Sequence, residues 1–146
     1  MSHCPDLWNV LHDGTIVALA GQVPGEVKLQ IEADYLRHRF GDDGLLFVLT
    51  LRDCRSLVFR PWEEGRSAIT RLDDLETLAL WILSAEEVDG TCAVTCNRKI
   101  GNGGGVLEVA AGDAVLCLDT GRLVSKDEIE GVAEAYWTEW SSRRPE

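Results

Sequence analysis

The sequence contains no long hydrophobic run. Its longest uninterrupted apolar stretch extends from Leu78 to Leu83, whereas a membrane-spanning helix needs about 20 apolar residues. The N-terminal residues also lack a basic segment followed by an apolar one, so no secretory signal is expected. These absences argue against a membrane-spanning or secreted protein and predict a cytoplasmic one.

The cysteines lack the pattern of a disulfide framework or of a metal site. Their number, 5, is odd, which favours free thiols in a reducing compartment. On a strand, Cys92 and Cys96 would lie about 13 Å apart, too far for one zinc ion, so we interpret them as core residues that face inward. His3, Cys4 and His12 have no fourth ligand at a matching spacing. We therefore expect neither a metal nor another cofactor.

Basic residues are scarce, with 14 Lys and Arg against 25 Asp and Glu, which gives a net charge of −11. Residues 1–60 contain 8 acidic and 6 basic side chains, and residues 61–146 contain 17 and 8. Such a field repels phosphate backbones, which argues against general binding of nucleic acids or anionic membranes. The charge would suit a basic protein partner, although it also serves to keep a domain soluble.

The chain also lacks a specific catalytic or cofactor-binding motif. Adjacent carboxylates such as Glu63-Glu64 do not form an acid/base pair, because neighbouring side chains of an extended segment point to opposite faces. The glycine-rich stretch at residues 101–105 does not end in the Gly-Lys-Ser/Thr of a phosphate-binding loop. We interpret it as a flexible hairpin loop.

What the sequence does contain is a regular series of turn signals. They recur about every ten residues, and short apolar or alternating runs lie between them, a pattern typical of consecutive antiparallel hairpins. In the clearest run, Val27, Leu29 and Ile31 alternate with polar residues. The signals are Asp13-Gly14, Pro24-Gly25, Asp42 to Gly44, Arg52 to Cys54, Asp89-Gly90, Gly101 to Gly105, Gly112-Asp113 and Thr120-Gly121.

The turn signals divide the chain into short strands. The pair at 45–51 and 57–62 is predicted to form a hairpin around Asp53, and the apolar residues on both faces of 45–51 indicate a strand covered on both sides. Residues 78–86 could continue a helical turn that begins at Asp73, but the Asp89-Gly90 turn favours a strand there. The expected strands are 15–21, 26–32, 45–51, 57–62, 78–86, 91–96, 106–110, 114–118 and 122–124.

A helix is predicted from Ser125 to Ser142. Ser125 and Glu128 have the spacing of a capping box, in which the serine hydroxyl accepts from the third backbone N–H and the glutamate reaches back. One apolar stripe follows, as expected for an amphipathic helix. It consists of Ile129, Val132, Ala133, Tyr136 and Trp140.

Together these patterns predict a single α+β domain over residues 1–146. Its main part is a mostly antiparallel meander of about eight strands, curled or closed into a barrel-like sheet, with the C-terminal amphipathic helix packed on it. The sheet could instead divide into two layers. A chain of this length buries about 68–70% of its unfolded surface, so it can fold without a disulfide or metal. Nothing in the sequence sets the oligomeric state.

Five acidic residues in the middle of the chain are the candidate partner-binding residues. We expect them to form an acidic ridge that a basic protein could contact, although solvated charge and a capped helix start also account for them. They are Glu63, Glu64, Asp73, Asp74 and Glu76.

Cys54 is the candidate reactive thiol. It lies at a predicted turn between Arg52 and Arg55, and nearby cations lower the pKa of a thiol. A nucleophilic cysteine would also need a base, for which His38 or His12 would have to be brought close by tertiary structure. The alternative is a turn residue without a catalytic role.

Two further groups of residues have a structural and a functional interpretation. Arg37-His38-Arg39 is a basic island that would form salt bridges to neighbouring acids or hold an anion. Trp137 and Trp140 would pack the C-terminal helix or anchor a partner, since tryptophan is frequent in binding hot spots.

Several short segments resemble small uncharacterised bacterial domains. They are Leu11 to Gly14, Val23 to Val27, Tyr35 to Arg37, Phe59 to Glu63 and Ala135 to Trp140. Proteins of similar size, acidity and α+β composition include immunity proteins that neutralise a toxin from the same or a neighbouring cell. The resemblance implies a toxin-neutralising role and supplies no catalytic residue.

Three functions follow as hypotheses, in this order. The first is a non-enzymatic protein-binding module, such as an immunity-type protein, that presents its acidic surface to a basic partner. The second is a carrier of a small apolar ligand, because a meandering sheet can close around a cavity. The third is a cysteine-dependent enzyme that uses Cys54 with His38.

Overall fold

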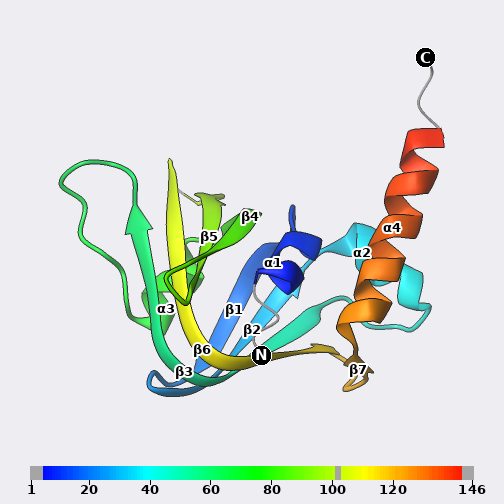
Figure 1. Ribbon diagram of the computed structural model, residues 1–146, viewed down its shortest axis with the longest axis horizontal. Coiled ribbons are helices and arrows are strands. Elements are labelled where there is room, and N and C mark those ends of the chain that lie inside the picture. The colour runs from blue at the N-terminus through cyan, green and yellow to red at the C-terminus, as the bar shows by residue number, and fades with distance from the viewer. Residues whose placement is uncertain (1–4, 101–102, 143–146) are drawn as a thin grey trace.

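Two long strands, β3 (Phe47–Pro61) and β6 (Gly104–Leu118), pair along their whole length and give the computed structural model its shape (Figure 1). The structure describes residues 5–100 and 103–142. Both strands are far longer than the predicted segments, and both bend sharply near their middle (Figure 1). The rest of the sheet is arranged around this bent pair.

The bend replaces two turns that the sequence pattern predicts. Asp53 adopts a left-handed backbone with φ of 52°, and the register against β6 shifts between Cys54 and Ser56, which marks a β-bulge. Gly112 lies opposite, where an added Cβ would be 3.2 Å from the Cβ of Asp53. The hairpin expected around Asp53 and the turn expected at Gly112-Asp113 are therefore wrong, because these residues bend two paired strands instead of reversing the chain.

The sheet has seven strands, all paired antiparallel. Their order is β3-β2-β1-β4-β5-β6-β7, and the additional β3–β6 pairing closes the first six into a ring that is not a regular barrel. The join between β1 and β4 is the weakest, with Thr15 opposite Trp81. The predicted α+β antiparallel class is confirmed. The remaining strands are β1 (Thr15–Gly21), β2 (Gly25–Glu32), β4 (Leu80–Val88), β5 (Thr91–Arg98) and β7 (Leu123–Val124).

The β4–β5 hairpin forms as predicted. Asp89 and Gly90 connect the two strands, and both have positive φ, 51° and 79°. A two-residue type I′ turn requires this conformation at both central positions, and Asp-Gly is one of its preferred sequences. The strand interpretation of residues 78–86 is confirmed, with the strand starting at Leu80.

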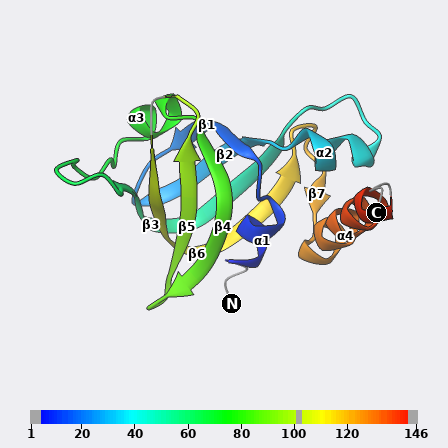
Figure 2. The same ribbon diagram turned by 90° about the horizontal axis from the view of Figure 1, so that it is seen from above.

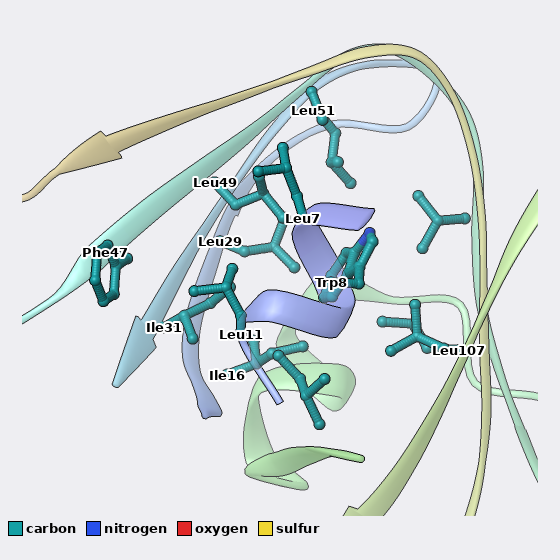
Figure 3. Close-up of a cluster of buried hydrophobic side chains, with 14 of the residues drawn as sticks. Leu7, Trp8, Leu11, Ile16, Leu29, Ile31, Phe47, Leu49, Leu51 and Leu107 are labelled. Carbon is teal, nitrogen blue, oxygen red and sulfur yellow. The ribbon is translucent and has the colours of Figure 1, made fainter. Parts of the chain in front are cut away.

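A short helix, α1, packs against β4 and α4 and places the Trp8 side chain inside the ring (Figure 3). Its Trp8 is 0% exposed. Figure 3 shows this side chain between Leu29 and Leu49 on one side and Leu107 on the other, so that it joins opposite walls of the sheet. The helices are α1 (Asp6–Val10), α2 (Asp34–Arg37) with the 3₁₀ turn η1 (His38–Phe40), α3 (Leu72–Thr77) and α4 (Lys126–Ser142).

The C-terminal helix α4 begins at the predicted cap. The Ser125 hydroxyl accepts a hydrogen bond from the Glu128 N–H at 3.1 Å, while the Glu128 carboxylate binds Arg122. Ile129 and Ala133 are buried in the core. Beyond them α4 lies against α1 and α2, and its last turns extend past the sheet (Figures 1 and 2). Among the described residues, no helix has both the length and the apolar character needed to cross a membrane.

Candidate partner-binding groove

The predicted acidic ridge is divided into two separate places. Glu63 and Glu64 are exposed just after β3, whereas Asp73 and Asp74 lie in the first turn of α3. The chain between them makes a long excursion away from the sheet before it reaches α3 (Figure 1). Glu63 pairs with Arg66 at 2.8 Å, and in the described part of the chain no hydrogen bond or ion pair joins Glu63 or Glu64 to α3.

Glu76, the fifth predicted residue, has a structural role. Its carboxylate accepts a hydrogen bond from the backbone N–H of Leu19 at 2.8 Å. β1 pairs with β4 only at Thr15, opposite Trp81. Leu19 lies further along β1, where β4 no longer pairs with it, so its N–H would otherwise lack a partner. Glu76 therefore caps an open strand edge, and its interpretation as a partner-binding residue is not supported.

Cys54 is buried at the bend of β3, not exposed at a turn. Its side chain is 0% exposed, and its Sγ lies 3.5 Å from the carbonyl oxygen of Ser56. Burial raises the pKa of the Cys54 thiol, and the neighbouring Asp53 carboxylate adds to the rise. The expectation that Arg52 and Arg55 lower this pKa is wrong, because the thiol faces the core while both arginines are exposed.

The structure also separates Cys54 from the proposed base. His38 is exposed on η1, and no described contact joins it to Cys54. Cys92 and Cys96 face inward on β5, as predicted, and burial raises the pKa of Cys96 to about 12. The described residues contain no group of three or more His, Cys, Asp and Glu side chains able to hold a metal ion. His3 and Cys4 lie outside the described residues, as do Gly101 and Asn102 of the predicted glycine loop.

The burial of Cys54 predicts that its thiol reacts slowly. Cys54 is expected to react with a thiol-specific reagent at least about tenfold more slowly in the folded protein than in urea, because both access and thiolate formation are suppressed. Peptide mapping by mass spectrometry after timed labelling would measure the rate. Cys117, which is half-buried, serves as the control and should react faster. Equal rates for Cys54 in the folded and unfolded states would contradict its placement.

The basic island forms salt bridges, as one of its two interpretations predicted. Arg37 is 2% exposed and binds Asp42 at 2.6 Å, Asp119 at 2.7 Å and the carbonyl oxygen of Leu46 at 2.9 Å. The guanidinium holds the pKa of Asp42 below its usual range. Burial by itself would raise the pKa of Asp119, but hydrogen bonds from Arg37 and from two backbone N–H groups lower it overall. Arg39 pairs with Glu139 of α4.

The aromatic residues of α4 hold the helix in place. Trp137 stacks on His12 with 5.4 Å between ring centroids and also contacts Tyr136 and Trp140. The Tyr35 hydroxyl donates to the carbonyl oxygen of His12. The packing interpretation therefore accounts for Trp137, while Trp140, near the end of the helix, is 42% exposed.

A groove that no sequence pattern indicated runs along β6. The pairing of β5 with β6 ends at Val109 and that of β7 begins at Leu116. Between these points residues 110–115 pair with β3 on one side, and no strand in the described part of the chain pairs with them on the other. A groove of about 460 Å³ lies at this open edge, lined by Asp113 to Leu116, by Leu7 of α1 and by residues 123–127.

Side chains cap open strand edges at two other places in the sheet. The Asn9 carboxamide donates to the carbonyl oxygen of Ala85 at 2.9 Å and accepts from its N–H at 2.8 Å, which imitates a neighbouring strand on β4. On β1, the Glu76 carboxylate accepts a hydrogen bond from the Leu19 N–H. Proteins commonly protect strand edges in this way. For residues 110–115, the described side chains supply no such cap.

The groove is acidic. Asp113 lines it directly, Asp127 lies at its α4 side, and a smaller pocket continues along the same edge to Glu87. The one cation in its lining, Lys126, is held by Asp6 at 3.2 Å and by Glu130 at 3.6 Å. Hydrogen bonding to Asp6 and the charges of both carboxylates raise the pKa of Lys126. The surroundings therefore carry a clear excess of negative charge.

The described residues form a small α+β protein in which six antiparallel strands close a ring and an acid-lined groove lies at an open edge of β6. No protein-family model, no curated protein and no solved structure matches the chain. The space inside the ring, which a carrier of apolar ligands would need, is occupied by Trp8 and its neighbours.

Proposed function

We propose that this protein is a non-enzymatic protein-binding module that presents the acidic groove along β6 to a basic partner. The observation that supports it best is the combination of an uncapped strand edge with carboxylates around it. A monomeric protein usually covers such an edge, because exposed backbone groups promote unwanted association. An edge left open beside a groove is typical of a recognition site.

The overall charge supports the same function. With a net charge of −11, the protein attracts basic proteins over a distance, and charge complementarity raises association rates and excludes acidic competitors. An immunity-type protein that neutralises a basic toxin is one example of such a module, and we retain it as part of the proposal.

The proposal predicts a partner that depends on the groove. Tagged protein recovered gently from its own cells is expected to carry a second polypeptide at fixed stoichiometry, measured by native mass spectrometry. The double variant Asp113→Lys/Asp127→Lys should lose this polypeptide at least about tenfold, because it places two cations beside the open edge. The double variant Glu63→Lys/Glu64→Lys makes the same change in net charge outside the groove and should retain the second polypeptide.

The two variants separate the groove from the general charge. Loss of the partner in the Glu63/Glu64 variant alone would move the site to the predicted acidic segment and contradict the groove. Circular dichroism and thermal unfolding would verify that both variants fold. A bare monomer under every growth condition would contradict the proposed function itself.

A further inference from the structure

We infer that the groove binds an extended basic segment of the partner as an added β-strand along residues 110–115 of β6. This inference rests on the proposed function and specifies how the partner is held. Addition of a strand would satisfy the open edge with main-chain hydrogen bonds, while the side chains of the incoming segment would provide specificity.

The direction of the backbone groups supports strand addition. On β6, the Leu118 N–H donates to the carbonyl oxygen of Arg122 at 2.8 Å, and Leu116 pairs with Val124, so both face the β7 side. Alternate residues of a strand direct their N–H and C=O groups to the same side. The N–H and C=O of Ala114 therefore point into the groove.

The two neighbouring strands delimit the site. Cys92 of β5 pairs with Val109 at one end, and Val124 of β7 pairs with Leu116 at the other. The incoming segment would lie between β5 and β7 on the same side of β6. At about 3.3 Å per residue, an edge of this length accommodates roughly five or six residues.

The lining of the groove indicates the sequence of that segment. Leu7 and Val124 are buried and belong to its inner side. Asp113 alternates with the buried Ala114 and therefore faces outward. Asp127 is exposed. Because strand side chains alternate between two faces, the fitting segment alternates apolar residues, which face Leu7, with lysine or arginine, which face the carboxylates.

The test uses a defined probe, a capped six-residue peptide in which valine and lysine alternate. Titration into ¹⁵N-labelled protein, followed by NMR, is expected to shift the backbone amides of residues 112–116 and 123–127 at millimolar peptide. Two modified peptides carry N-methyl groups on the valines or on the lysines, so that each removes the donors of one strand edge.

One of the two N-methylated peptides should bind at least about tenfold more weakly than the unmodified peptide, and the other should bind nearly as well. With valine facing inward, the peptide that loses binding also reports whether the added strand runs parallel or antiparallel to β6. The probes act on the unmodified protein, so the result does not depend on a variant that folds poorly.

A protein variant provides an independent measurement. Ala114→Pro removes the N–H that points into the groove but leaves the bonds to β3, and proline is tolerated where an edge N–H faces outward. It should weaken binding of the unmodified peptide at least about tenfold, with the fold verified by circular dichroism.

Three results would overturn the inference: equal binding of both N-methylated peptides, amide shifts confined to residues 63–76, or no shift along residues 112–116. None of these would remove the proposed function, which depends on recovery of the partner. Conversely, a bare monomer in the recovery experiment would contradict the proposed function even if the peptide bound.

Discussion

Replacing Trp8 by alanine is expected to lower the free energy of unfolding by about 4 kcal/mol, within the range for truncation of a large core aromatic residue. Trp8 is 0% exposed and contacts opposite walls of the ring (Figure 3). Its loss would leave a cavity where the strands cannot collapse, because each is held in register by its neighbours. Urea unfolding followed by far-ultraviolet circular dichroism would measure the change.

Trp62 provides the matched control. It is 59% exposed at the end of β3, so Trp62→Ala should lower the free energy of unfolding by no more than about 1 kcal/mol. Similar losses for the two variants would contradict the placement of Trp8 inside the ring. A large loss for Trp62→Ala alone would contradict the placement of the core.

Replacing Arg37 by methionine is expected to lower the free energy of unfolding by about 3 kcal/mol, because breaking a buried ion pair leaves its partners without a counter-charge. Arg37, the last residue of α2, links this helix to the loop after η1 through Asp42 and to the end of β6 through Asp119. Arg39→Met is the control. Its ion pair with Glu139 is more exposed, and such pairs contribute less than about 1 kcal/mol.

Arg37→Met should also change how the free energy of unfolding depends on pH. The pKa values of Asp42 and Asp119 are lowered in the folded protein from the ordinary value of 3.8. The folded state therefore binds these protons less readily than the unfolded state, and the stabilisation is complete above this pH and lost as the pH falls through the folded pKa values. Urea unfolding at neutral pH and at several values below about pH 4 should show a steeper loss in the natural protein than in Arg37→Met. Parallel curves would contradict this role of Arg37.

Patterns between near neighbours in the chain were enough to predict much of the local structure. The alternation around Val27 to Ile31, the Asp89-Gly90 turn and the Ser125 cap depend on backbone conformation and solvent exposure within a few residues. These preferences hold in any context that leaves one face of the segment in contact with water. They were sufficient for the α+β class and for the C-terminal helix.

The bends of β3 and β6 could not be predicted in this way. Asp53 and Gly112 carry the same signal as turn residues, since a left-handed backbone and a close approach of two chains are needed both in turns and in bulges. Whether a turn or a bulge forms depends on whether a partner strand continues past the residue. That partner is supplied by a segment about 60 residues away, so no local pattern contains the answer.

The candidate site depends on long-range structure for the same reason. Glu76 is an exposed acid in the sequence pattern, yet folding brings it to Leu19 and makes it a cap on β1. The groove exists because β5 and β7 end at different points along β6. Composition and periodicity therefore establish which segments are strands and which are helices. The pairing of distant segments determines which strand edge stays open to a partner, because an edge is open only where no neighbouring strand pairs with it.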